Sequence, residues 1–219
     1  MVKAQAKPSR RQARTPEDRE ARMQAIRAAA LNVFSEKGFS AARIDDVAAA
    51  AGIAKGTVYL YFASKDELLE AIVGKTIGAT LAQVEQAVTA SPLPALEKLR
   101  LISRAIIAAL GDSDRRRVLH IVLSEGGRFP AIADFYHREI IARAMRLLRA
   151  VLAQGQRDGE FVADELARFP QLFIAPALVA AIWAVVFGRI EPLDAGAMLE
   201  AHFDLLLRDL ARSKPGIPT

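Results

Sequence analysis

Cysteine is absent from this 219-residue sequence. Its absence excludes disulfide bonds, cysteine nucleophiles and sites in which cysteine holds zinc or an iron–sulfur cluster. The basic start of the chain is followed by polar and charged residues rather than by an apolar stretch, so we expect no signal peptide. This composition fits a reducing, cytoplasmic environment.

Strand-forming patterns are also nearly missing. Alanine, leucine and arginine dominate, apolar residues recur at intervals of three and four, and alternating valine and isoleucine are rare. This periodicity predicts an all-α protein. Turn and capping residues divide it into about nine helices, expected near residues 16–37, 44–51, 55–61, 65–88, 94–110, 114–125, 130–156, 165–188 and 194–212.

Acidic residues are absent from residues 1–14, which carry five lysines and arginines. These charges equal the formal net charge of the whole chain, +5, so residues 15–219 are neutral overall. We expect residues 1–14 to form a disordered basic arm. The arm either adds sequence-independent affinity for nucleic acid through counterion release or acts as a solubilising tail, and the sequence favours neither.

Charge is absent from residues 172–188. A helix that spans a bilayer needs about 20 apolar residues, which is more than this run supplies, and Pro176 interrupts it. We therefore favour a helix buried in the core or in a subunit interface over a membrane span.

Residues 44–62 have the spacing of a helix-turn-helix, with a turn at Gly52 and with Val58 and Phe62 placed to face one core. The second helix of such a motif enters the major groove of DNA. The residues at its N-terminal tip are suited to base edges: Lys55, Gly56 and Thr57. Nearby hydroxyl and ammonium groups are suited to phosphates: Tyr59, Tyr61 and Lys65. The alternative is a helical hairpin whose tyrosines only pack.

Residues 23–73 resemble the DNA-binding domain of the TetR family of bacterial transcriptional regulators. The likeness is carried mainly by Gly56-Thr57-Val58-Tyr59-Leu60-Tyr61-Phe62, Ser64-Lys65-Asp66-Glu67-Leu68 and Ala51-Gly52-Ile53. The resemblance implies DNA contacts at Lys55, Gly56, Thr57, Tyr59, Leu60, Tyr61 and Lys65, and the side chain of Arg43 is itself suited to contact a phosphate or enter the groove. The sequence departs from the family pattern at Ala42-Arg43, where a threonine is usual.

The resemblance also implies the organisation of the chain. We expect a helix-turn-helix domain at residues 15–68, a ligand-binding and dimerisation domain at 69–212 and a tail at 213–219. Two copies would form a homodimer through the last two helices and bind a palindromic double-stranded DNA operator. The implied function is transcriptional regulation, most often repression that a small hydrophobic or amphipathic effector relieves, without a cofactor and without a membrane.

Polar and aromatic side chains in the second expected domain are candidates for the effector pocket. They are Arg104, His120, Phe135, His137, Phe173 and Trp183. Each also fits an ordinary role in packing or at the surface. His120, for example, lies in an apolar stretch where a histidine is more often part of the core.

Catalytic and metal-binding patterns are weak. Gly74-Lys75-Thr76 resembles the end of a phosphate-binding loop, but Leu69 occupies the position of the first glycine and no strand is expected before it. No two histidines have the spacing that places metal ligands on one helix face, so we predict no metal site. We predict that the protein is not an enzyme. The alternatives are a helical dimeric adaptor without DNA binding and, more remotely, an all-α enzyme.

Overall fold

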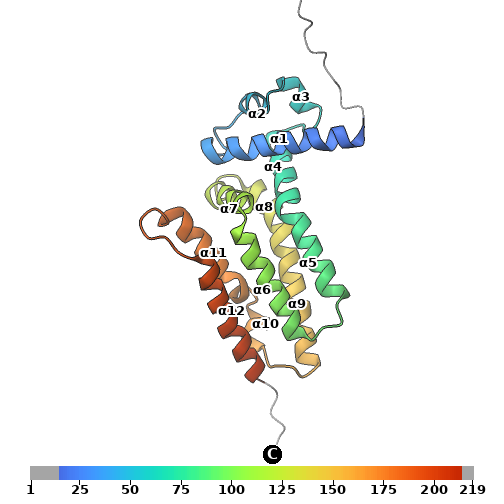
Figure 1. Cartoon of the computed structure of the whole chain (residues 1–219), viewed down its shortest axis with the longest axis vertical. Coiled ribbons are helices and arrows are strands. Elements are labelled where there is room, and N and C mark those ends of the chain that lie inside the picture. The colour runs from blue at the N-terminus through green and yellow to red at the C-terminus, as the bar shows by residue number, and fades with distance from the viewer. Residues whose placement is uncertain (1–14, 214–219) are drawn as a thin grey trace, which may run out of the picture.

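The computed structural model describes residues 15–213, and these are helical with no strand among them. The predicted arm at 1–14 and all but the first residue of the predicted tail lie outside the described residues. Figure 1 shows an elongated molecule in which one helix lies across the end of a bundle of longer helices. The predicted all-α class is confirmed.

Three helices form the end of the molecule that we call the N-terminal layer: α1 (Pro16–Lys37), α2 (Ile44–Ala50) and α3 (Lys55–Tyr59). α1 begins at Thr15, whose hydroxyl accepts a hydrogen bond from the Asp18 N–H at 3.1 Å. It ends before Gly38, whose φ of 77° lies in the region that favours glycine. Both ends of α1 are therefore set by local residues.

A continuous helical rod leads away from the N-terminal layer (Figure 1). It consists of α4 (Lys65–Val73), the π-helical turn η1 (Gly74–Gly78) and α5 (Ala79–Ala90). The hydroxyl of Ser64 caps its start by accepting from the Glu67 N–H at 3.0 Å. One helix was expected at 65–88, and the π turn is the feature that the sequence pattern did not indicate.

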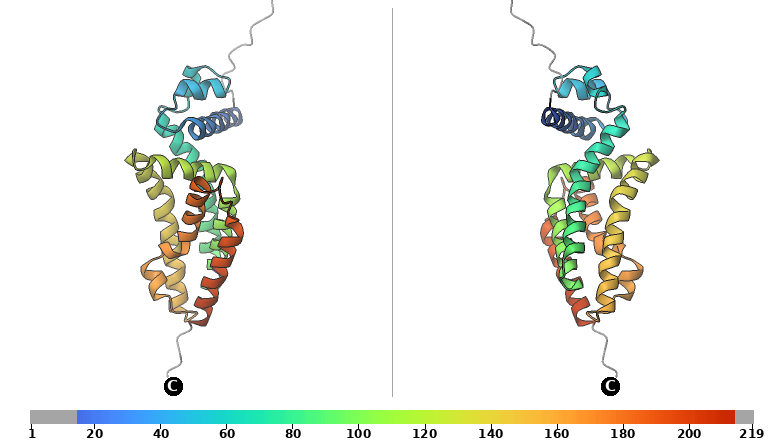
Figure 2. Two further views of the ribbon diagram at one scale, coloured as in Figure 1. Left: turned by 90° about the vertical axis from the view of Figure 1, so that its left-hand side faces the viewer. Right: turned by 90° about the vertical axis from the view of Figure 1, so that its right-hand side faces the viewer.

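The bundle continues with two more helices and a second rod: α6 (Ala95–Gly111), α7 (Ser113–Glu125), and α8 (Pro130–Tyr136) joined through the π turn η2 (His137–Ile141) to α9 (Ala142–Arg157). Figure 2 shows α7 lying across the bundle at its junction with the N-terminal layer. The two π turns pack against each other. A π turn within a helix often marks a functional position.

The last helices differ from the prediction in one respect. The helix expected at 165–188 is two helices, α10 (Asp164–Arg168) and α11 (Gln171–Val186), followed by α12 (Ala195–Arg212). Pro170 separates them because proline disfavours the helical conformation at the residue before it and has no N–H to donate. With the rods joined by π turns counted once, residues 15–213 contain ten helices rather than about nine.

Buried apolar side chains form two clusters. The first holds the N-terminal layer together around Phe34, Val47 and Val58 and extends into α7 at Val118 and Ile121. The second lies between α6, α9, α11 and α12. The N-terminal layer and α7 therefore share one core, and a displacement of α7 acts directly on the layer.

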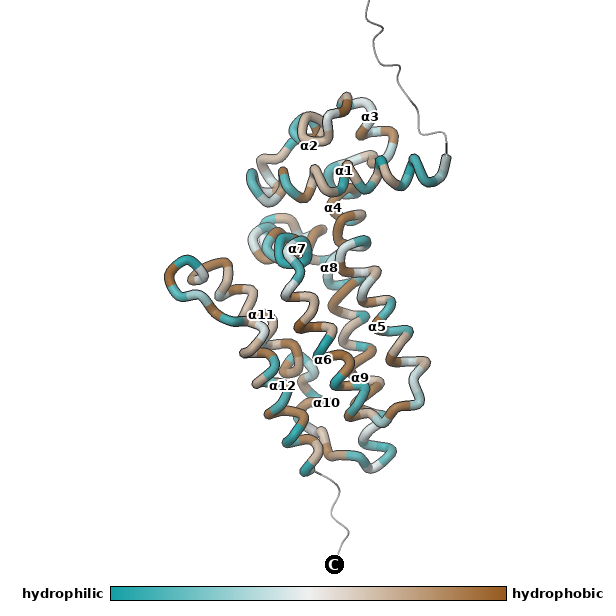
Figure 3. The backbone as a smooth tube through the Cα atoms, in the orientation of Figure 1, coloured by the Kyte–Doolittle hydropathy of each residue, from teal (hydrophilic) through white to brown (hydrophobic). Residues whose placement is uncertain are grey.

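The apolar run at 172–188 forms most of α11, which Figure 3 colours largely toward the hydrophobic end of its scale. Within the described part of the chain, no helix combines the length and the apolar character needed to cross a membrane. The helix instead packs against α6, α7 and α12.

Candidate DNA-binding surface and ligand pocket

The turn between α2 and α3 is built by its own residues. Gly52 has a φ of 65°, in the left-handed region where a Cβ would be strained. The Ile53 N–H donates to the Ala48 carbonyl at 3.0 Å and closes the turn. Val58 is fully buried and Phe62 nearly so, which fixes the inner face of α3. The opposite face of α3 must therefore point to solvent.

The outer face of α3 carries most of the predicted DNA-contacting residues. Tyr59 and Leu60 are 47% and 70% exposed, which is high for large side chains of a short packed helix. Lys55 and Gly56 are also exposed, whereas Thr57 and Tyr61 are partly buried. These six residues lie on and just after α3, and we call them the α3 surface, although Tyr61 packs in part against the first core cluster, with the Arg19 guanidinium 5.8 Å from its ring centroid. The α3 surface consists of Lys55, Gly56, Thr57, Tyr59, Leu60 and Tyr61.

Lys55 forms an exposed ion pair with Asp45 of α2, at 2.8 Å between Nζ and Oδ2. The hydrogen bond from Lys55 to Asp45 raises the pKa of the lysine above its ordinary value, so its charge is secure at neutral pH. Exposed pairs of this kind are weak in water. The ammonium is thus able to exchange Asp45 for another acceptor.

Arg43 stands at the start of α2 with an exposed side chain. Its backbone N–H donates to the carboxylate of Asp46 at 2.9 Å. Asp46 also accepts a hydrogen bond from Lys37. The bond from Lys37 is the main cause of a pKa of Asp46 below its ordinary value, and the bond from the Arg43 N–H lowers the pKa further. Asp46 therefore caps α2 and neutralises Lys37, and Arg43 projects from the same end of the helix.

Lys65 is placed differently from the other cations. Its Nζ donates to the carbonyls of Phe39 at 2.6 Å, Ala42 at 3.2 Å and Ser40 at 3.3 Å, and lies 4.4 Å from the centroid of the Phe39 ring. All three donors of the ammonium are thus directed at the loop between α1 and α2. Contact between Lys65 and a phosphate remains a prediction, and it requires the ammonium to leave these carbonyls.

An apolar cavity of about 160 Å³ lies among the helices of the bundle. Its lining comes from the α4–η1–α5 rod and from α6, α7, η2, α9 and α11. It includes Ile77, Val84, Ile102, Ile140, Leu148 and Phe173. Thr80 and Arg115 are its polar lining residues. Such a cavity accepts an apolar body and offers hydrogen bonds at one place.

Of the six predicted pocket residues, Phe173 lines this cavity. Phe135 lines a smaller hollow between α4 and α8, and Arg104 and His137 are exposed. The indole N–H of Trp183 donates to the Glu191 carbonyl at 2.8 Å. His120 lies on α7 and is not among the residues that line the cavity.

The sequence singled out neither of the polar lining residues, Thr80 and Arg115. Arg115 is the charged one of the two. It belongs to the run Asp112-Ser113-Asp114-Arg115-Arg116-Arg117, which looks like a solvated helix start. One signal does point to it. Arg115, Val118 and Val122 are spaced by three and four residues, and Val118 is fully buried, so Arg115 lies on the inner face of α7.

Exposed apolar side chains gather on α11. Val179, Ile182 and Val186, spaced by three and four residues, are 52%, 48% and 55% exposed. Other exposed apolar residues on this helix and the segment after it are Leu172, Leu178, Val185, Phe187, Ile190 and Leu193. We call Val179, Ile182 and Val186 the α11 face. An apolar surface of this extent marks an interaction site.

Groups of three or more histidine, aspartate or glutamate side chains able to hold a metal ion do not occur within residues 15–213.

Comparison with known proteins gives matches along most of the chain. Residues 26–72 match the model of the bacterial regulatory proteins of the tetR family, and residues 97–202 match the C-terminal domain of AefR-like transcriptional repressors. The fatty acid metabolism regulator protein of Bacillus subtilis (strain 168) is 28% identical over 182 residues, which cover 81% of this chain and 84% of that protein.

Solved structures share the fold. The SmeT–triclosan complex has a TM-score of 0.73 at 18% identity, covering 91% of this chain and 98% of the other. The transcriptional regulator FadR from Bacillus subtilis in complex with stearoyl-CoA has a TM-score of 0.67 at 23% identity, covering 84% of this chain and 97% of the other.

Proposed function

Because this chain belongs to the TetR family and is a DNA-binding transcriptional regulator, we propose that it is a repressor that a small hydrophobic or amphipathic effector releases from a palindromic operator. The observation that carries the proposal is one helical rod, α4–η1–α5. It begins beside the α3 surface and lines the apolar cavity with Ile77, Thr80 and Val84.

On DNA, α3 enters the major groove. Lys55, Gly56 and Thr57 approach base edges from the tip of the helix, and Leu60 contacts the groove wall. Arg43, Tyr59 and Tyr61 hold phosphates on either side. Each subunit of a homodimer reads one half-site, and the half-sites lie about one helical turn, roughly 34–36 Å, apart or a multiple of it.

The α11 face, together with α12, forms the homodimer interface. Its exposed valine and isoleucine side chains are costly in water and are covered when a second copy packs against them. A four-helix contact from two copies of α11 and α12 would set the spacing of the two α3 helices. The dimer acts in the cytoplasm and has no enzymatic role.

The effector binds in the cavity and shifts the rod, which moves the two α3 surfaces out of register with DNA. A ligand changes this equilibrium only by the difference in its affinity for the two states. The two structural relatives named above were solved with triclosan and with stearoyl-CoA, both of which have large apolar parts. The apolar lining of the present cavity supports an effector of similar character.

Selection of bound fragments from genomic DNA at near-physiological salt tests the DNA-reading assignment. The wild-type protein is run beside the double variant Lys55→Ala/Tyr59→Phe and beside Arg149→Ala, which alters an exposed cation on α9. We expect the wild type and the Arg149 variant to recover the same palindromic site and the double variant to lose it. Equal recovery by all three proteins would overturn the assignment, and recovery of no site by the wild type would favour the adaptor.

A further inference from the structure

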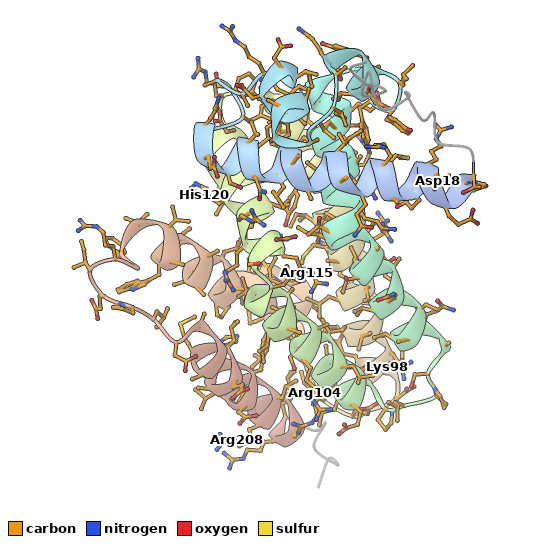
Figure 4. The ribbon with its side chains drawn as sticks, turned by 45° about the horizontal axis from the view of Figure 1, so that its top comes forward. Asp18, Lys98, Arg104, Arg115, His120 and Arg208 are labelled. Carbon is orange, nitrogen blue, oxygen red and sulfur yellow. The ribbon has the colours of Figure 1, made fainter. Side chains whose placement is uncertain are left out.

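The guanidinium of Arg115 lies at the wall of an apolar cavity and donates to two neutral acceptors, while the carboxylate of Asp112 accepts from the Arg115 backbone N–H. The Arg115 Nη2 donates to the Thr80 hydroxyl at 2.7 Å, and its Nε donates to the Thr76 carbonyl at 3.1 Å. None of the carboxylates that the structure describes forms an ion pair with it. Figure 4 places Arg115 in the middle of the molecule, in contrast to Arg104 and Arg208 near its far end.

This arrangement favours an anion. A guanidinium offers parallel N–H donors that match the two oxygens of a carboxylate, and such charge-assisted bonds are about twice as strong as bonds to neutral acceptors. The hydroxyl and carbonyl now facing Arg115 are acceptors that a carboxylate outcompetes. Apart from Thr80, every other lining side chain is apolar, so the rest of the ligand must be apolar as well.

The size of the cavity limits the apolar body. A dry cavity of about 150 Å³ holds a benzene molecule. The cavity of about 160 Å³ described above therefore accommodates a phenyl ring or a short alkyl chain without rearrangement of its walls.

We propose that the effector is a monocarboxylate with a compact apolar body, whose carboxylate binds Arg115 in place of Thr76 and Thr80. The inference rests on the proposed function, because it names the chemical class of the effector and the first step of its action. The carboxylate takes over the donors that now tie α7 to the rod.

The position of these acceptors links binding to the DNA-reading end. Thr76 lies in the π turn η1 and Thr80 lies in the next turn of α5, so both are on the rod. On the other side, Arg117 of α7 donates to the side-chain carbonyl of Asn32 in α1. α7 is therefore bonded to the rod through Arg115 and to the N-terminal layer through Arg117. When Arg115 binds a ligand instead, the bonds from α7 to the α4–η1–α5 rod are lost and the bond from Arg117 to the N-terminal layer remains.

Isothermal titration of the DNA-free protein with matched probes tests the proposal. The probes are 4-phenylbutyrate and 4-phenylbutan-1-ol, with octanoate and octan-1-ol as a pair that has an alkyl body. We expect at least one acid to bind the wild type about tenfold or more tightly than its alcohol. Arg115→Gln should abolish this preference, whereas Arg116→Gln, a matched change of an arginine that donates to the Leu110 and Gly111 carbonyls, should keep it.

The proposal is overturned if the alcohols bind the wild type as well as the acids, if none of the four probes binds, or if Arg115→Gln retains the preference. None of these outcomes depends on DNA. An operator recovered by the fragment selection together with a failed titration would reject the carboxylate while leaving the repressor proposal in place.

Thr80→Val provides a second variant that retains the cation. Removal of the hydroxyl deletes one acceptor that competes with the ligand, so we expect the acid to bind severalfold more tightly and the alcohol to bind as before. Thr80→Ser keeps a hydroxyl and should behave as the wild type. Unchanged or weaker binding of the acid by Thr80→Val would contradict the competition between the rod and the ligand.

Discussion

At the scale of single residues, two lysines of the helix-turn-helix have the same expected role but different surroundings. Lys55 forms an ion pair with an exposed carboxylate, Asp45, which we expect DNA to replace. Lys65 holds three backbone carbonyls of the loop between α1 and α2. These carbonyls need a donor whether or not DNA is present, so Lys65 mainly stabilises the loop between α1 and α2.

Substitution by glutamine should therefore affect stability at Lys65 and operator binding at Lys55. We expect Lys65→Gln to lower the free energy of unfolding by about 1–3 kcal/mol, because carbonyls now bonded to a charged donor lose it. Lys55→Gln should leave stability almost unchanged and weaken operator binding. Chemical denaturation and titration of a labelled operator measure the two quantities. A stable Lys65→Gln protein that fails to bind DNA would show that Lys65 acts mainly on phosphate.

At the scale of elements, α7 connects the cavity with the N-terminal layer, and its start determines where Arg115 lies. The carboxylate of Asp112 caps this helix by accepting from the Asp114 and Arg115 N–H groups, each at 2.9 Å. The backbone hydrogen bond from Arg115 is the main cause of a pKa of Asp112 below its ordinary value. The cap therefore fixes the first turn that carries the Arg115 side chain.

We expect Asp112→Ala to reduce the free energy of unfolding by about 1 kcal/mol at neutral pH, the typical value of an N-cap. Because folding lowers the pKa of Asp112, its contribution is present above the unfolded pKa, about 3.9, and is lost as the pH falls through the lower folded value. The difference in free energy of unfolding between wild type and Asp112→Ala, measured by denaturant titration, should become smaller in that pH range.

Asp112→Asn serves as the control for this prediction, since asparagine is an equally good N-cap without a charge. The free energy of unfolding of Asp112→Asn should exceed that of Asp112→Ala by the same amount at every pH. If the difference in free energy of unfolding between wild type and Asp112→Ala stayed constant down to acid pH, the charge of Asp112 would not contribute to stability.

At the scale of the whole molecule, the α11 face is an apolar surface that a single chain leaves uncovered. Its three residues lie on one side of the helix and are each about half exposed. A stable homodimer typically buries at least 1,200 Å² in total, and the apolar side chains of α11 suit such an interface. The proposed spacing of the two α3 surfaces depends on it.

The double variant Ile182→Glu/Val186→Glu should convert the proposed dimer to a monomer, because burial would place unpaired carboxylates in an apolar interface. We expect sedimentation velocity to show a species of one chain, and operator affinity to fall with it. Leu93→Glu, which places a charge on an exposed leucine between α5 and α6, should remain dimeric. A dimeric Ile182/Val186 variant would place the interface elsewhere.

The sequence by itself determined whatever depends on neighbouring residues. The period of three and four residues gives helices, Thr15 and Ser64 start two of them, and Gly52 makes the turn of the helix-turn-helix. The family resemblance and the all-α class follow from the same local patterns, and both are confirmed. The outer face of α3 could be predicted because the inner face is fixed by Val58 and Phe62.

Only the tertiary structure decided where distant side chains meet. Lys65 reaches carbonyls 23 to 26 residues away, and Arg115 reaches Thr80 and Thr76, 35 and 39 residues away. Spacing along one helix carries no information about such pairs, since they depend on how helices cross. For this reason five of the six side chains that the sequence suggested for the pocket, Arg104 among them, lie outside the cavity lining. Packing placed Phe173, Thr80, Arg115 and a set of ordinary aliphatic residues around the cavity.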